Sequence, residues 1–356
     1  MEELRTGIDV ARAFHAAAVG PLLARELPGL AYAAGRLGSG SDVVGLDDAT
    51  SRDHDWGCRL TLLVDEADAA MAAKVDELLA DQLPETFAGL PVRFPVSWDR
   101  TDTHNVEVAT VHGFAASRLG VAPDALPAIP HLDWLTVTGQ GVIEVAVGPV
   151  FHDATRELAP VRSALAWYPP DVDRYVLASA WFGIGERLTL LGRTADRGQE
   201  LQSRLLGAQV VAALMHVAFL VHRTWMPYPK WREAIFQRLP DASSLSAHFE
   251  TALSAAPVRE REQALAEAAQ ILLDVQRSRG LPAPDQAVGP FWDRPHLVVN
   301  GEVVRLLIES VDDGQLRALP LMGAPEQWVD SEAVLAKPEL RIGLGATHRA
   351  WLRPQT

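Results

Sequence analysis

The strongest constraint on the fold is a change in sequence pattern near residues 160–170. Before this point, short apolar runs stand between turns rich in glycine and proline, which is typical of mixed helix and strand structure. After Tyr168-Pro169-Pro170, apolar residues recur at helical spacing in segments of helix-forming composition. We therefore predict an α+β protein, with an α/β domain built on a short mixed sheet at 1–165 and a helical bundle at 166–356.

The first half of the chain offers several individual elements. We expect a helix at 8–25, kinked or split at Gly20-Pro21, and an amphipathic helix at 68–83. Alternating apolar residues predict strands at 53–65, 91–98 and 105–111. Residues 142–147 fit either a strand or a buried helical turn, because periodicity does not separate the two. Helices are expected at 172–191, 199–225, 231–239, 244–255 and 258–279.

The chemistry of the chain centres on residues 40–56. Gly40 to Gly45 read as a glycine-rich turn, in which Gly40 allows close backbone approach to phosphate and Ser41 offers a hydroxyl and an amide. Asp53 and Asp55 would project from one face of the following strand, with His54 facing away. Two neighbouring carboxylates repel each other unless a cation lies between them. The stretch therefore predicts a divalent metal beside a phosphate site.

A third carboxylate would complete such a site. Glu107 stands within the apolar strand predicted at 105–111, and Glu144 is the alternative, between Ile143 and Val145. Mg²⁺ prefers oxygen ligands, and the third carboxylate can also accept the proton of an attacking hydroxyl. Lys230, between aromatic residues in the second half, could reach a nucleotide phosphate; the alternative is a surface lysine.

These motifs resemble the signature of the DNA polymerase β-like nucleotidyltransferase superfamily, a Gly-Ser pair, then roughly ten residues, then Asp-x-Asp. Here Gly40-Ser41 and Asp53-His54-Asp55 are separated by residues 42–52. More widely, the chain resembles a bacterial nucleotidyltransferase-like family of uncharacterised function. The resemblance implies a catalytic α/β domain followed by a helical bundle, similar to kanamycin nucleotidyltransferases. It is carried by residues 40–57, 106–120, 148–153, 228–231 and 293–295.

The resemblance implies a nucleotidyltransferase that uses Mg²⁺, or alternatively Mn²⁺, held by Asp53, Asp55 and Glu107. It would move a nucleoside monophosphate from a nucleoside triphosphate, with ATP as the expected donor, to the hydroxyl of a small molecule. Two alternatives remain open. One is an enzyme that AMPylates protein side chains. The other is a catalytically silent nucleotide-binding regulatory protein, in which Glu107 is structural and the three carboxylates do not converge.

Charge, cysteine content and hydropathy indicate which partners and which compartment are expected for this chain. The formal charge of −14 argues against general nucleic-acid binding, which needs clustered Lys and Arg. Cys58 is the only cysteine, so an intramolecular disulfide is excluded and a packing role is expected. The apolar segment at 210–221 carries His216 and is too short to span a bilayer. Without a recognisable signal peptide, a cytoplasmic protein that binds no membrane is expected. The sequence leaves the oligomeric state open.

Overall fold

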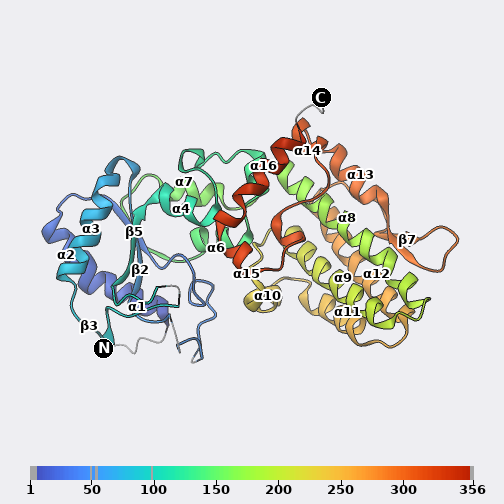
Figure 1. Ribbon diagram of the computed structural model, residues 1–356, viewed down its shortest axis with the longest axis horizontal. Coiled ribbons are helices and arrows are strands. Elements are labelled where there is room, and N and C mark those ends of the chain that lie inside the picture. The colour runs from blue at the N-terminus through green and yellow to red at the C-terminus, as the bar shows by residue number, and fades with distance from the viewer. Residues whose placement is uncertain (1–5, 49, 53–54, 98, 353–356) are drawn as a thin grey trace. The chain divides into compact units, whose positions relative to one another are not determined.

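The computed structural model describes residues 6–48, 50–52, 55–97 and 99–352 (Figure 1). It divides into two compact units, the first comprising Met1–Ile129 with Gly141–Ala166 and the second Pro130–Gln140 with Trp167–Thr356. The first unit contains a four-stranded sheet, whereas the second is mainly helical. The predicted α+β class with a small mixed sheet and a helical C-terminal region is therefore confirmed.

The sheet of the first unit has the strand order β5-β2-β1-β6. Strand β1 is antiparallel to both of its neighbours, whereas β2 and β5 run parallel. Consequently the end of β1 and the starts of β2 and β5 meet at one end of the sheet. In register, Gly35 lies opposite Thr61, and Thr61 lies opposite Glu107. The strands are β1 (Tyr32–Gly35), β2 (Arg59–Val64), β5 (Asn105–Thr110) and β6 (Val150–Asp153), with a separate pair β3 (Thr86–Phe87) and β4 (Leu90–Pro91).

The two faces of this sheet differ because strand side chains alternate. Leu60, Leu62 and Val64 of β2 pack into a core with residues of the helices α1, α2 and α3. Arg59 and Thr61 point to the other face, together with Glu107 of β5. The helix α4, which directly follows β5, contacts both β5 and β2. The helices are α1 (Gly7–Phe14), α2 (Gly20–Glu26), α3 (Ala69–Gln82), α4 (Val111–Leu119), α6 (Gly139–Ala146) and α7 (Leu158–Ala164).

The structure corrects several predicted boundaries in the first unit. The strand predicted at 53–65 begins only at Arg59, because the chain bends at Asp55 (φ +55°) and at Gly57 (φ +145°). Instead of a strand at 91–98, beyond β4 there are two isolated bridges, Arg93 to His104 and Val96 to Asp99. Residues 142–146 belong to the helix α6.

The helix predicted at 8–25 is also divided differently. The interruption is a π-helical turn at His15–Val19, one turn before the predicted break. The chain stays helical through Val19 and Gly20 into α2, so the missing N–H of Pro21 falls inside a continuous helix, directly after the π-helical turn.

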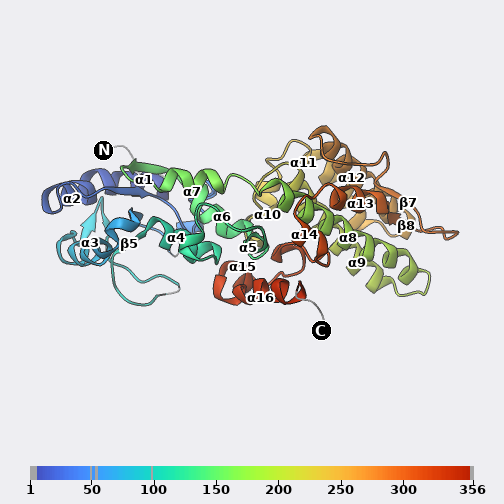
Figure 2. The same ribbon diagram turned by 90° about the horizontal axis from the view of Figure 1, so that it is seen from above.

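The second unit is organised around long helices whose apolar residues recur at helical spacing (Figures 1 and 2). Helices α8 and α9 pack against each other, and α12 packs against both α9 and α11. A short hairpin, β7 (Val288–Pro290) and β8 (Leu297–Val299), precedes the C-terminal helices. The helices are α5 (His131–Trp134), α8 (Pro170–Ala195), α9 (Glu200–Val221), α10 (Pro229–Phe236), α11 (Ala242–Ser254), α12 (Val258–Ser278), α13 (Gly301–Glu309), α14 (Gly314–Ala318), α15 (Glu332–Ala336) and α16 (Ile342–Trp351).

Helix α9 is apolar along most of its length. Among the described residues it is the one helix long and apolar enough to cross a bilayer by length and composition. However, 61% of its most apolar window is buried inside the fold, as in the core helix of a soluble protein. The structure is therefore compatible with a soluble protein.

Candidate functional site

The glycine-rich turn after β1 is built around a buried ion pair. The guanidinium of Arg36 donates from Nε to Asp42 Oδ2 (2.7 Å) and from Nη2 to Asp42 Oδ1 (3.0 Å). It also donates to the backbone carbonyls of Leu37 and Ser39. Both charged side chains are almost fully buried. The path of the turn is therefore set by hydrogen bonds to one guanidinium.

Gly40 is required by this arrangement. Its φ of +147° is unfavourable for other residues, and a Cβ there would overlap both Asp42 Oδ1 and Arg36 Nη2. Ser41 follows at a partly exposed position, and its carbonyl accepts from the N–H of Leu46 (2.8 Å). The close approach expected at Gly40 is thus present, and the group that approaches is the Arg36–Asp42 pair.

Of the predicted pair of carboxylates, one is described. Asp55 lies in the bend before β2, and its Oδ1 accepts from the backbone N–H of Ser97 (2.6 Å). Its backbone carbonyl accepts from Nη1 of Arg59 (3.1 Å). Asp53 and His54 lie outside the described residues. The expected geometry of two carboxylates on one strand therefore does not apply to Asp55, which precedes the strand.

The two candidates for the third carboxylate are joined by one arginine. Arg118 Nη2 of helix α4 lies 2.5 Å from Glu107 Oε1 and 2.7 Å from Glu107 Oε2. Its Nε lies 3.1 Å from Glu144 Oε2. The Glu107 side chain is 44% exposed, whereas that of Glu144 is 11% exposed. Both carboxylates therefore belong to the same cluster, and the more accessible one is Glu107.

This cluster lies directly against the glycine-rich turn. The N–H of Gly38 donates to the backbone carbonyl of Glu144 (2.7 Å). A Cβ added to Gly38 would be 3.6 Å from Arg118 Nη2 and 3.7 Å from Glu107 Oε2. The backbone at Gly38, just before the turn, therefore lies beside the carboxylate cluster.

Arg59 adds a further positive charge at the same end of the sheet. Burial is the main reason that its pKa is lowered, to about 9, and the neighbouring Arg36 lowers it further. The carboxylates of Asp42, Asp55 and Glu107 act in the opposite direction. All three carboxylates thus act on the charge of Arg59, which is still protonated at neutral pH.

The donors at this site suit magnesium in kind, because carboxylate oxygens are its usual protein ligands. Some of these oxygens are already hydrogen-bonded within the protein, since both carboxylate oxygens of Glu107 accept from Arg118. Over the described ranges, which omit Asp53, no three His, Cys, Asp or Glu side chains are grouped closely enough to hold a metal ion. Ligation by Glu107 therefore requires Arg118 to move.

The remaining predicted residue, Lys230, belongs to the second unit, near the start of α10. Its Nζ lies 4.8 Å from the ring centroid of Trp231, as expected for a lysine between aromatic residues. Sequence reasoning missed three arginines of this site, Arg36, Arg59 and Arg118. A signal exists only for Arg36, which stands immediately before the glycine-rich segment.

A comparison with known families matches part of the chain. Residues 134–232 match the model of a domain of unknown function, DUF4037. The matched segment includes Glu144 and Lys230, whereas Gly40, Asp55 and Glu107 lie before it. No curated protein and no solved structure gives a significant match. The chain is thus similar, over residues 134–232, to a domain whose function is unknown.

Proposed function

We propose that the first unit catalyses nucleotidyl transfer, moving a nucleoside monophosphate from a nucleoside triphosphate, with ATP as the expected donor, to the hydroxyl of a small molecule and releasing pyrophosphate. One observation carries the proposal: Arg59 donates to the backbone carbonyl of Asp55 and lies on the same face of the sheet as Glu107, beside a glycine-rich turn whose path is set by the Arg36–Asp42 pair. A preorganised turn next to oxygen ligands is what the transfer of a phosphoryl group requires.

Each residue of the site has a role in this proposal. Asp55, Asp53 and Glu107 would hold Mg²⁺, or Mn²⁺ in its place, which when bound neutralises the triphosphate and orients its α-phosphate. The hydroxyl and amide of Ser41 bind phosphate oxygens. A carboxylate oxygen of Glu107 accepts the proton of the attacking hydroxyl.

Arg118 decides whether Glu107 is available. Its guanidinium contacts Glu107 and Glu144 at once, so it can release Glu107 while its Nε remains on Glu144. The exchange keeps a positive charge beside the turn, where the phosphates of the donor would lie. Lys230 is proposed as a further contact to a phosphate of the nucleotide. Separately, the protein is proposed to be cytoplasmic.

The same ion pair favours a second candidate, a silent nucleotide-binding protein. If Arg118 stays on both oxygens of Glu107, this carboxylate neutralises an arginine and serves neither as ligand nor as base. Nucleotide would then bind without transfer.

Incubation with α-³²P-labelled nucleoside triphosphates, Mg²⁺ and a metabolite extract separates the two. The proposal expects label transfer by the wild type, and loss of transfer in Asp55→Asn and in Glu107→Gln. The matched control is Asp81→Asn, which removes an exposed carboxylate of α3 and should transfer normally. Transfer that persists in Asp55→Asn would contradict the metal site, and nucleotide binding without transfer would favour the silent protein.

A further inference from the structure

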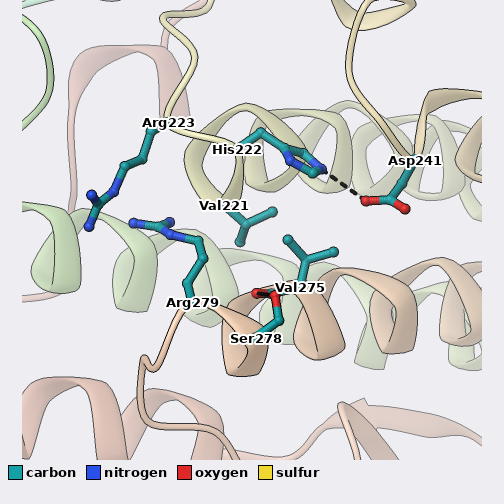
Figure 3. A pocket seen from close by; sticks show the side chains of 7 residues that line it. All are labelled: Val221, His222, Arg223, Asp241, Val275, Ser278 and Arg279. Carbon is teal, nitrogen blue, oxygen red and sulfur yellow. Dashed lines mark hydrogen bonds and ion pairs between the residues drawn. The ribbon is translucent and has the colours of Figure 1, made fainter.

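The helical unit contains a second arginine-lined site, far from the glycine-rich turn in sequence. It is an open hollow of about 490 Å³ at the adjoining ends of α9 and α12 (Figure 3). Two guanidiniums, those of Arg223 and Arg279, line it together with the imidazole of His222 and the apolar side chains of Val221 and Val275. Hollows of roughly 300–1,000 Å³ are the usual size of small-molecule sites.

Arg223 occupies a position that normally takes glycine. Helix α9 ends in the hydrogen-bond pattern of a left-handed cap, with Thr224 N–H donating to Phe219 O (3.0 Å) and Arg223 N–H to Leu220 O (3.1 Å). Arg223 itself has φ +50°, which is strained for a residue with a side chain. An arginine at this point is therefore unfavourable for the backbone, and its use points to a role for the guanidinium.

Arg279 is held in place from two sides. Its Nη1 donates to the carbonyl of Leu220 (3.0 Å) in the last turn of α9, and its Nη2 donates to Asp173 Oδ2 (2.9 Å). These contacts fix the guanidinium at the hollow before any ligand arrives. Preorganisation of this kind reduces the entropy lost on binding.

The hollow is lined by charges of both signs, since Arg223 and Arg279 are positive and Asp241 is negative, and positive charge is in excess only on the arginine side. The carboxylate of Asp173, 3% exposed, pairs with Arg279 and lies 3.9 Å from Arg223 Nη2. One buried negative charge thus faces two positive charges, and the Arg223 side chain is 59% exposed. His222 is paired separately, its Nε2 lying 3.0 Å from Asp241 Oδ2. In Figure 3 the two guanidiniums lie side by side, whereas His222 points toward Asp241.

We propose that this hollow binds the phosphate group of a small phosphorylated molecule through Arg223 and Arg279. The guanidiniums come from two helix ends and can therefore contact different oxygens of a tetrahedral group, whereas a planar carboxylate is satisfied by one guanidinium fork. A phosphate dianion also offsets the excess of the two arginines over Asp173 on that side of the hollow. The carbon skeleton of the ligand packs against Val221 and Val275. All of these residues belong to the second unit, so the proposal is independent of the nucleotidyl-transfer site.

The structure supplies a spectroscopic readout. Asp173 Oδ1 accepts from the indole N–H of Trp167 (3.0 Å), and the Trp167 ring packs on Trp225 at 4.6 Å. A phosphate that binds beside the Arg279–Asp173 pair adds negative charge there and changes the electrostatic field at Trp167. Ligand binding should therefore alter the intrinsic tryptophan fluorescence.

The test is a titration of the full chain, without Mg²⁺, with ribose 5-phosphate, inorganic phosphate and acetate as probes, followed by fluorescence and calorimetry. The variant Arg223→Gly removes the guanidinium while placing glycine where the cap favours it, so it should melt at or above the wild-type temperature. Arg223→Lys retains the charge. Arg277→Gln is the matched control, since Arg277 pairs with Asp274 (2.8 Å) on the same helix end without lining the hollow.

We expect ribose 5-phosphate to bind more tightly than inorganic phosphate, and acetate to bind least. Arg223→Gly should weaken phosphate binding about tenfold, as expected for the loss of one charge-assisted contact, and Arg277→Gln should not. Asp55→Asn should bind as the wild type does, which keeps this test separate from the nucleotidyl-transfer proposal. Equal phosphate affinity in wild type and Arg223→Gly, no saturable binding, or acetate binding as tightly as phosphate would each overturn the proposal.

Discussion

Two arginine–carboxylate pairs lie at the glycine-rich turn, one enclosed by it and one beside it, and they differ in burial. Arg36 and Asp42 have side chains 2% and 8% exposed, whereas Arg118 and Glu107 are 23% and 44% exposed. Separating the buried pair would leave a charge in a low-dielectric interior, so that pair can only shape the turn. The exposed pair can exchange partners at little cost, because water solvates the released groups. Burial therefore separates the arginine that builds the site from the arginine that can respond to a ligand.

Arg36→Met should have the largest effect. It leaves the Asp42 carboxylate buried without its partner, and removal of one member of a buried pair costs about 3–5 kcal/mol of unfolding free energy. Urea denaturation measures this. The double variant Arg36→Met/Asp42→Leu should recover most of the loss, since no unpaired charge remains. A single variant as stable as the wild type would remove the distinction between the two pairs.

Gly40→Ala should be nearly as damaging. The new Cβ would adopt an unfavourable φ and also overlap the Arg36–Asp42 pair, with an expected loss of about 3 kcal/mol in unfolding free energy. Gly45→Ala is the matched control: its φ of +67° is also positive, but nothing lies within 4 Å of its Cβ position. It should lose only about 1 kcal/mol. Equal losses in the two variants would mean that the buried pair does not constrain the turn.

The dependence of stability on pH tests the burial of a titratable group, the imidazole of His216. Burial lowers the pKa of His216 to about 3, and the positive charge of Arg232 contributes to this lowering. Between this value and its ordinary pKa of about 6.5, the unfolded chain binds a proton that the folded chain refuses, so stability falls as pH falls. His216 should cost about 2 kcal/mol of unfolding free energy between pH 7 and pH 5. His216→Leu should lose this part of the acid dependence, and an unchanged pH profile would refute the assignment.

Arg118→Ala should have the smallest effect on folding, about 1–2 kcal/mol in urea denaturation, because water reaches Glu107 (44% exposed) while Glu144 (11% exposed) loses this ion pair. Its effect should appear in metal binding. Glu107 and Glu144 lose their counter-charge, so Mn²⁺ affinity, followed by electron paramagnetic resonance of the free ion, should rise. Arg118→Lys should behave like the wild type. Weaker Mn²⁺ binding in Arg118→Ala would show that the arginine supports the metal site instead of competing for Glu107.

Much of the fold could be predicted from the sequence because its signals are local. Helical spacing located α9 and α12, and alternation located β5 at residues 105–110. The start of β2 was wrong because the bends at Asp55 and Gly57 interrupt an alternating pattern that continues on both sides. Gly57 could have indicated this. The π-helical turn at His15–Val19 directly precedes Gly20-Pro21, so the proline marks the irregularity in the sequence but not its type.

The candidate site was less predictable, because its charges are paired through the tertiary structure. Position along the chain indicated Glu107 and Glu144 as alternatives, but their shared contact with Arg118 depends on where α4 packs on the sheet. Likewise, a turn that looked suited to phosphate proved to enclose the Arg36–Asp42 pair. A sequence pattern identifies residues capable of chemistry; their partners are decided by packing.

The central claim is that the glycine-rich turn with Asp55 and Glu107 binds a nucleoside triphosphate together with a divalent ion. Calorimetric titration of ATP into the wild type and Glu107→Gln, each with Mg²⁺ and with EDTA, tests it most directly. The account predicts saturable binding by the wild type in Mg²⁺, loss of that binding in EDTA, and weaker Mg²⁺-dependent binding by Glu107→Gln. ATP binding that is equally tight in EDTA, or unchanged by Glu107→Gln, would contradict it.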